Sequence, residues 1–461
     1  MPATDSSNLH AARPVFRWGD LSVLAADRAV DVPLDALLRD GGLHSVYQPF
    51  VDLDTGSVLA HEALLRGPAG TPWESPIVLL GSARSSGRLV DLERASLRTS
   101  IADASRMSLG RPTTLFVNVE PTTLTDNLEV ILEEVASRSA NVQVVVEITE
   151  RALAVDLAGI LAGAERLRAA GCAIALDDVG VEPESLAFIP LLRPEVVKLD
   201  LALLRSVSDV ATLTVAGAVR AYAEESGAEV VAEGVESAAD LTRARVLGAT
   251  LGQGWLWGRG NREIGPTTFR PERFTPRPLG AVLHSSPCQL LEKVRQVRRA
   301  PKSLLLPLSL SLEQMALQAR VPPVLLAGFE HAKFFTPATV RRYTELAVRL
   351  PFVCALGRDM PAVPAPGVRG AALSPQDPLA TEWTVVVLGA HKAAALIARD
   401  LGHDGDDGDR EFEFVVSYDR TLVTAAAHSL IGRLAPATVT PHPLPIQRTS
   451  SASKTRTARR V

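Results

Sequence analysis

Polar side chains that could bind a divalent cation follow most of the short aliphatic runs in the first half of the chain. Each run ends in a carboxylate, an amide or a lysine, and these residues are Glu62, Asn118, Glu147 with Glu150, Asp177 with Asp178, Lys198 with Asp200, Glu233 with Glu236, and Gln253. Carboxylates gathered at one place repel each other, and a hard divalent cation relieves that repulsion. Oxygen ligands alone favour Mg²⁺ or Mn²⁺ over zinc. The pattern predicts a metal site if the runs end at one rim, and scattered solvated acids if they do not.

The aliphatic runs alternate with helical patterns between Leu43 and about Gly260. Two of the runs are VQVVVEIT and CAIALDDVG, and near-continuous aliphatic runs of this kind are typical of strands buried on both faces. Stretches such as LAGILAGAERLRAAG show helical periodicity. About eight such strands in roughly 220 residues predict an α/β fold, a (β/α)8 TIM-like barrel. Functional side chains of such barrels lie at the C-terminal ends of the strands.

Residues 43–258 resemble the EAL family of cyclic di-GMP phosphodiesterases, named for the tripeptide that stands here as Glu62-Ala63-Leu64. The resemblance rests on strings that occur in the family's order and approximate spacing: YQPFVDLDTGSVLAHEALLR, LFVNVEP, VEITE, DDVG, VKLD, AEGVE and GQG. Each string alone is weak, and the ordered set is specific. It implies hydrolysis of cyclic di-GMP to linear pGpG with one or two Mg²⁺ or Mn²⁺ ions, and a homodimer formed through the barrel.

The resemblance also implies a role for each matching residue. The family's metal-binding positions correspond here to Glu62, Asn118, Glu147, Asp177, Asp178 and Glu233, of which Asp178 can join a second metal. The catalytic positions correspond to Lys198, near the attacking water and scissile phosphate, to Glu233, and to Gln253, which helps to hold the water network. Substrate-contacting positions correspond to Gln48 and Arg66, and supporting positions to Glu150, Asp200 and Glu236.

The loop after the paired aspartates departs from the family's pattern. The family's DDFGxGxSSL stands here as DDVGVEPESL, so that Val179 replaces the usual phenylalanine and Glu182 the second glycine. Glu182 resists a positive φ that glycine adopts readily, and Pro183 stiffens the turn beside it. Since every expected metal ligand is retained, the loop predicts low or differently regulated activity. A catalytically inactive cyclic di-GMP receptor, a signalling scaffold and an enzyme acting on another phosphodiester remain alternatives.

A second unit with its own strand and helix patterns follows the barrel. Residues from about 288 to 434 resemble the DICT domain, a presumed sensory module, through strings such as PPVLLAGFEHAKFF and DPLATEWTVVVLGAHKAAALIARDL. We expect a smaller mixed α/β sensory domain that binds an unidentified ligand or protein. The expected divisions are a disordered N-terminus (1–20), the barrel (21–260), a linker (261–287), the DICT-like domain (288–434) and a disordered basic tail (435–461).

Composition argues against two classes of partner. The chain has 461 residues with 48 basic and 52 acidic side chains and a formal net charge of -4, so it lacks the basic excess of a DNA-binding surface. No run approaches the roughly 18 apolar residues of a membrane span. The three cysteines, Cys172, Cys288 and Cys354, are far apart and are expected to be reduced. We therefore expect a cytoplasmic protein that binds neither membrane nor DNA.

Overall fold

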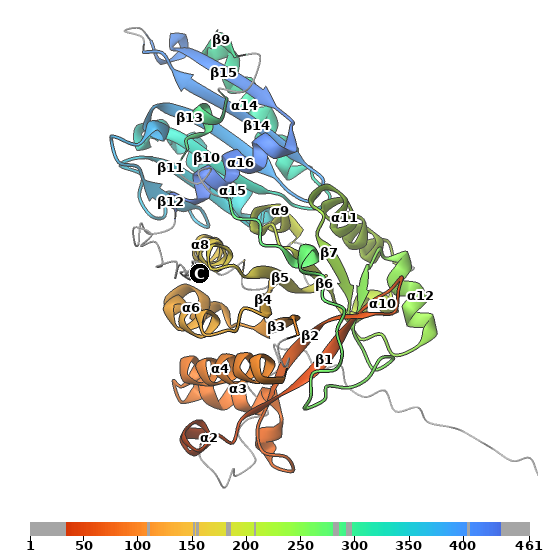
Figure 1. The fold of residues 1–461 in the computed structure, drawn as a ribbon. Helices are drawn as coiled ribbons and strands as arrows, with labels where there is room; N and C mark the ends of the chain where they lie inside the picture. Colours follow the sequence, from red (N-terminus) through yellow and green to blue (C-terminus); the bar gives the residue numbers. More distant parts are fainter. Residues whose placement is uncertain are drawn as a thin grey trace, which may run out of the picture.

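The computed structural model describes residues 34–107, 111–150, 153, 156–180, 186–206, 209–279, 285–291, 297–402 and 406–434. The expected disordered ends, 1–20 and 435–461, lie outside these ranges. The described residues form a closed eight-stranded barrel followed by a seven-stranded sheet. In Figure 1 the barrel runs from red to green and the second sheet from teal to blue. No described helix combines the length and the apolar character that a membrane span requires.

The barrel strands follow one another in sequence order around the barrel. They are β1 (His44–Asp52), β2 (Val58–Arg66), β3 (Thr113–Asn118), β4 (Val142–Thr149), β5 (Ala173–Val179), β6 (Val196–Leu199), β7 (Glu229–Ala232) and β8 (Leu251–Gly252). The helices of this part are α2 (Leu34–Asp40), α3 (Pro76–Ser85), α4 (Leu89–Met107), α5 (Pro121–Asp126), α6 (Leu128–Ala136), α8 (Leu157–Ala169), α9 (Ile189–Leu192), α10 (Leu201–Arg205), α11 (Val210–Ser226) and α12 (Ala238–Val246). The α/β barrel predicted from the sequence is confirmed.

The first strand departs from the simple repeat, because β1 runs antiparallel to both of its neighbours, β2 and β8. The connection between β1 and β2 explains this. Asp52 Oδ1 accepts hydrogen bonds from the backbone N–H groups of Asp54 and Thr55, and Gly56 has a φ of 70°. Such a short turn joins antiparallel strands, whereas a parallel crossover needs a dozen residues or more.

Side chains that alternate inward along the strands fill the barrel. A layer of buried apolar residues crosses its interior, and its aromatic members are Phe50, Phe116 and Phe274. The Phe116 ring centroid lies 4.4 Å from that of Phe50 and 5.5 Å from that of Phe274. Phe274 comes from the segment that was expected to be a linker, and Thr268 N–H of the same segment donates to Val58 O. Residues 261–279 therefore pack on the barrel. They close its lower end, which is the end where the parallel strands begin.

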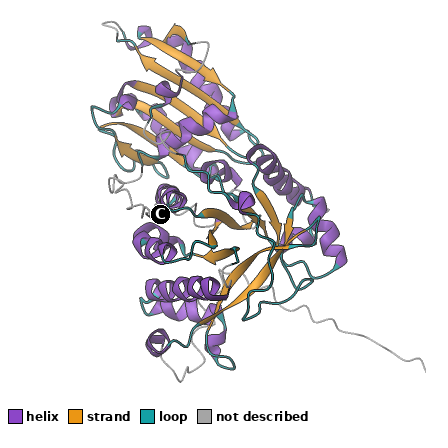
Figure 2. Cartoon of the chain, in the orientation of Figure 1, coloured by secondary structure: helices purple, strands orange, loops and turns teal. Residues whose placement is uncertain are grey.

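The second domain is a mixed sheet with the strand order β12-β11-β10-β13-β14-β15-β9. The strands are β9 (Arg298–Pro301), β10 (Val324–His331), β11 (Val353–Arg358), β12 (Arg369–Ala372), β13 (Glu382–Leu388), β14 (Ala393–Asp400) and β15 (Glu411–Ser417). Its helices are α13 (Pro287–Leu290), α14 (Lys302–Leu317), α15 (Pro337–Arg349) and α16 (Arg420–Ile431). As Figure 2 shows, helices cover both faces of this sheet. A second, smaller α/β domain was the expectation.

The second domain packs against the barrel through α16. Leu326, Val386 and Ile397 face α16, and the apolar cluster that they share with Val423 and Leu430 continues into the barrel helices. The His428 ring places Nε2 2.6 Å from the carbonyl oxygen of Leu191, the third residue of α9. The two domains therefore share one continuous apolar core.

Candidate active site at the barrel mouth

The strand pleat carries the predicted site residues to one end of the barrel. Successive side chains of a strand point to opposite faces, so inward positions recur every second residue. Phe116, Val145 and Val196 belong to the apolar layer, and the next inward positions along their strands are Asn118, Glu147 and Lys198. The same step leads from Ala60 to Glu62 and from Ala175 to Asp177. The apolar layer in the barrel interior thus sets the direction of these polar side chains, which form a ring at the C-terminal ends of the strands.

Lys198 lies at the centre of this ring. Its side chain is 1% exposed, and its Nζ is 2.9 Å from Glu147 Oε1, 2.9 Å from Asp177 Oδ1, 2.7 Å from Glu233 Oε1 and 3.9 Å from Glu62 Oε1. Each of these four carboxylates comes from a different strand or strand end. The structure therefore brings together residues that are far apart in the sequence. These four carboxylates form one group and are not scattered solvated acids.

Two amides hold Glu62 from its other sides. Asn118 Nδ2 donates to Glu62 Oε1 at 2.9 Å, and Gln253 Nε2 donates to Glu62 Oε2 at 2.6 Å. Burial would raise the pKa of Glu62, but Lys198 and these donors outweigh burial and hold the pKa below its usual value. Glu62 is therefore a fixed, ionised carboxylate with both oxygens oriented.

The other carboxylates show that negative charge exceeds positive charge here. Burial, followed by the charge of Glu62, raises the pKa of Glu147 well above its usual value. Burial also raises the pKa of Glu233. Burial alone would lower the pKa of Lys198, yet the carboxylates, with Asp177 first, raise it well above the ordinary lysine value. One ammonium does not balance this group, and additional positive charge would stabilise it.

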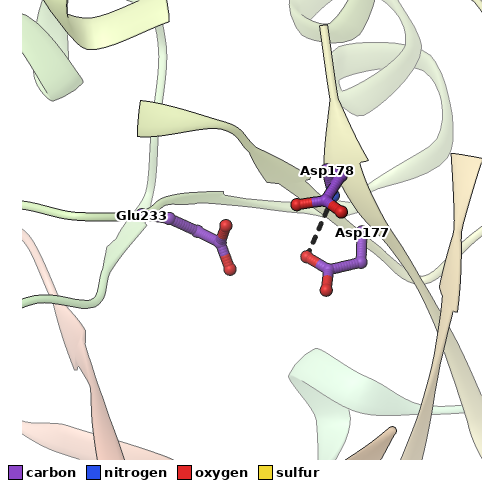
Figure 3. A group of neighbouring side chains, drawn as sticks. All are labelled: Asp177, Asp178 and Glu233. Atoms are coloured by element: carbon purple, nitrogen blue, oxygen red, sulfur yellow. Dashed lines mark hydrogen bonds between the residues drawn. The ribbon is translucent and has the colours of Figure 1, made fainter. Parts of the chain in front are cut away.

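A cation would find oxygen ligands already grouped. Asp177, Asp178 and Glu233 each offer a carboxylate oxygen, and these oxygens lie within 4.8 Å of one another. Figure 3 shows the three carboxylates facing a common space, with the Asp178 N–H donating to Asp177 Oδ1 at 3.0 Å. Both oxygens of Glu147 are buried without a well-directed hydrogen bond. The donor set fits a hard divalent cation such as Mg²⁺ or Mn²⁺.

Gln48, Arg66 and Glu150 lie around the carboxylate group. Gln48 is the cross-strand partner of Glu62, and Arg66 shares the face of β2 with Glu62 two inward positions further along. Arg66 is half-buried and its Nη1 donates to Leu65 O at 2.8 Å. Glu150 is buried, and its Oε2 accepts the N–H of Gly180 at 3.1 Å. Glu150 therefore ties the end of β4 to the loop after β5.

Asp200 and Glu236 are not brought to the carboxylate group. Asp200 is the N-cap of α10, where its Oδ1 accepts the N–H of Ala202 at 2.6 Å. Glu236 is exposed, and its own N–H donates to Asp240 Oδ2 at 3.3 Å next to the start of α12. Any supporting role of these two residues acts through the loops that begin α10 and α12.

One residue that matters for the site geometry was not singled out from the sequence. Gly180 follows the paired aspartates with a φ of 106°, and a Cβ there would lie 2.5 Å from Leu203 Cδ1. Only glycine meets both conditions. Its position after DDV was the available signal. The altered residues of the loop, 181–185, lie outside the described residues.

Two family models match the chain, one in each of its two domains. The EAL domain model matches residues 32–260. The first half of the chain is an EAL domain. Residues 284–401 match the model described as a sensory domain in diguanylate cyclases and two-component systems, the DICT domain. Both family resemblances seen in the sequence are thereby confirmed.

Relatives of this chain include proteins named as cyclic di-GMP phosphodiesterases. The chain is 30% identical over 238 residues to the cyclic di-GMP phosphodiesterase RocR of Pseudomonas aeruginosa, covering 48% of this chain and 58% of that protein. It is 29% identical over 231 residues to NbdA, another cyclic di-GMP phosphodiesterase of that organism, covering 48% of this chain and 29% of NbdA. The chain thus spans 58% of the length of RocR and 29% of that of NbdA.

Solved structures with a similar barrel include a PaMucR phosphodiesterase in complex with cyclic di-GMP, with 25% identity and a TM-score of 0.45, covering 50% of this chain and 95% of that one. Another is Klebsiella pneumoniae BlrP1 with calcium and cyclic di-GMP, with 25% identity and a TM-score of 0.44, covering 50% of this chain and 58% of that one.

Proposed function

We propose that the EAL domain hydrolyses cyclic di-GMP to linear pGpG with the help of one or two Mg²⁺ or Mn²⁺ ions. The observation that carries this proposal is the group of four carboxylates around Lys198, with Glu62 held by two amides. Membership of the EAL family and the names of its relatives support the choice of substrate.

The residues that would hold the ions are Glu62, Asn118, Glu147, Asp177, Asp178 and Glu233. When bound, divalent cations offset phosphate charge and make a coordinated water more acidic. Lys198 Nζ keeps its proton among the carboxylates and supplies fixed positive charge where negative charge develops on the phosphate. Gln253 and Asn118 keep Glu62 oriented, so the site reorganises little during the reaction.

Gln48 and Arg66 would contact the nucleotide. Gln48 lies on β1 directly opposite Glu62, and Arg66 is the last residue of β2, the strand that carries Glu62. A guanidinium suits phosphate because it offers several donors in one plane. Gln48 Nε2 donates to Gly258 O at 3.4 Å, a long hydrogen bond that a substrate atom could replace.

We also propose that the DICT domain regulates the barrel through α9. This short helix begins shortly after the altered loop that follows Asp178, and α16 of the DICT domain packs on it. Replacing His428 by phenylalanine should remove the hydrogen bond to Leu191 and lower hydrolysis several-fold. The control is His331→Phe at the end of β10, which loses contacts to Asp359 and Lys333 within the second domain only. Equal rates in both variants would count against this route of regulation.

The test of the main proposal is a product assay on the full chain with cyclic di-GMP and added Mn²⁺, with separation of the nucleotides by chromatography. We expect pGpG to appear with Mn²⁺ and to be absent when EDTA is added. The altered loop favours one alternative, a receptor that binds cyclic di-GMP without hydrolysing it. Binding measured by calorimetry without any pGpG would establish that alternative and overturn the proposed hydrolysis.

A further inference from the structure

A cavity of about 630 Å³ lies between the barrel and the DICT domain. Residues of α9, α11 and the segment 277–279 line one side, and residues of α16 line the other. Its size is that of a site for a small organic molecule. The carboxylate group at the barrel mouth contributes no residue to it.

Three arginines line this cavity, and two of them are engaged. Arg277 donates to the carbonyl oxygens of Ser226 and Pro194, and its Nε is 3.6 Å from Glu195. Arg420 donates to Gly389 O at 3.0 Å and Ala390 O at 2.9 Å. Its Nε is 3.7 Å from Glu225, which also lines the cavity. Both guanidinium groups already have acceptors.

Arg193 differs from these two. It is half-buried, and its guanidinium has neither a hydrogen-bond nor an ion-pair partner within the described part of the chain. Burial, followed by the charge of Arg168, lowers the pKa of Arg193. A half-buried cation beside another cation is stabilised by an anion.

The backbone at Arg193 strengthens this point. Arg193 ends α9 in the left-handed region, with φ 52° and ψ 50°. Glycine is the usual residue at this position of a helix end, because a side chain disfavours the conformation. The chain carries an arginine where glycine would be more stable, which is the kind of local strain that accompanies binding sites.

The other residues that line the cavity are apolar or neutral for the most part, and they indicate which kind of group would lie beside them. Ile189, Pro190, Ala218 and Leu279 offer apolar contacts. His428 places Nε2 against Leu191 O, and burial lowers its pKa to about 4, so the ring is neutral. His391 lies at an exposed position of the lining. Arg193 is therefore the charge left for an anionic group, and the surroundings suit an apolar body.

We propose that this cavity between the domains binds a small amphipathic organic anion whose acidic group contacts Arg193. A carboxylate and a phosphate monoester share the required chemistry. The proposal concerns a second site and does not depend on hydrolysis at the barrel mouth. Because Leu186, Ile189 and Pro190 line the cavity, a ligand there would contact the segment that begins α9.

The test compares two fluorescent probes with similar aromatic bodies on the full chain. 8-Anilinonaphthalene-1-sulfonate carries an anionic group, and N-phenyl-1-naphthylamine does not. We expect Arg193→Gln to weaken binding of the sulfonate at least tenfold and to leave binding of the neutral probe within twofold. Arg193→Gly should do the same, and because glycine suits the backbone there, misfolding cannot explain that loss.

Two further variants locate the probe. Ala221 is an exposed lining residue of α11, and Ala221→Trp should fill the cavity and weaken both probes. The matched control is Arg349→Gln at the end of α15, which should change neither. The proposal would be overturned if the sulfonate bound with the same affinity to the wild type and to both Arg193 variants. It would also be overturned if Ala221→Trp bound the two probes as tightly as the wild type does.

Displacement of the sulfonate identifies the acidic group. Octanoate, octyl phosphate and octanol share one apolar body and differ in the head group. We expect one of the two acids to displace the probe at least tenfold more effectively than octanol. Displacement by octanoate indicates a carboxylate site and displacement by octyl phosphate a phosphate site. Displacement by neither acid, or equally by octanol, would overturn the proposal.

Discussion

The two ends of the barrel both bury charged side chains, and they balance them differently. At the lower end Arg273 donates to both Glu229 and Asp52, and Arg168 pairs with Glu195 at 3.1 Å and Glu165 at 2.7 Å. At the mouth, five carboxylates face one ammonium. At the lower end each arginine thus serves two carboxylates through directed hydrogen bonds, whereas at the mouth one ammonium serves five. The mouth therefore has the larger excess of negative charge and room for a cation.

The pKa directions follow the same division. At the lower end Glu229 hydrogen bonds raise the pKa of Arg273, and Asp52 has a lowered pKa because its hydrogen bonds outweigh burial. At the mouth burial raises the pKa values of Glu147 and Glu233, whereas Lys198 and the two amides hold the pKa of Glu62 below its usual value. Burial alone therefore does not mark a functional site, since both ends are buried. The larger excess of carboxylates over cations distinguishes the mouth.

The largest expected effect is on catalysis at the mouth. Glu62→Gln should reduce pGpG formation at least about 10³-fold, equivalent to ~4 kcal/mol, because an oriented anionic ligand is lost while the volume is kept. Lys198→Ala should reduce it similarly. The matched control is Glu129→Gln, whose side chain is 68% exposed. Undiminished turnover in either mouth variant would remove that residue from the mechanism.

The next effect is on stability at the lower end. Arg273→Met should lower the free energy of unfolding by about 3 kcal/mol, because it leaves Glu229 and Asp52 without their cation. Hydrolysis per folded molecule should persist. Arg220→Met removes an exposed pair with Glu224 and should cost less than about 1 kcal/mol in denaturant titrations. Similar losses in both variants would contradict the comparison between the two ends.

A smaller effect is expected from the ion itself. Mn²⁺ at about 100 times its dissociation constant should stabilise the chain by ~2.7 kcal/mol, measured as a shift of the unfolding midpoint. Asp177→Asn should reduce the shift, because it removes one of the grouped carboxylates. Arg273→Met should retain it. A shift lost in both variants would show that the ion does not distinguish the mouth from the lower end.

The last effect concerns Glu93, a buried carboxylate of α4 outside both groups. Burial raises its pKa to about 8 from 4.5, so the folded chain binds a proton that the unfolded chain releases. Stability should therefore fall, by up to about 5 kcal/mol, as pH rises from about 4.5 to 8. Glu93→Gln should flatten this dependence, and Mn²⁺ should not alter it. An equally steep profile in the variant would exclude Glu93 as the cause.

Much of the mouth could be predicted from the sequence because strand ends carry a local signal. Glu147 and Asp177 each follow an aliphatic run, and the chain direction of a parallel strand decides which rim they join. The same reasoning grouped Asp200 with them, yet Asp200 caps α10. Aspartate directly before a helix is an N-cap signal, and a strand end that is also a helix start satisfies both patterns.

Other features depend on contacts between distant residues and leave no local trace. The antiparallel direction of β1 was only indirectly visible, in the short turn around Gly56. The hydrogen bond from Gln253 to Glu62 joins residues 191 positions apart. The left-handed backbone conformation at Arg193 has no signal in the sequence, because arginine is an ordinary residue near helix ends.

The hydrogen bond between His428 and Leu191 has a consequence for the order in which this chain acquires its structure. The two residues are 237 positions apart, and α9, with four residues, is too short to persist without neighbours. During synthesis the carbonyl oxygen of Leu191 therefore gains this partner only after the residues of α16 have left the ribosome. A nascent chain that stops before α16 would lack this hydrogen bond, whereas those from Arg168 to Leu192 O and Arg193 O could already form.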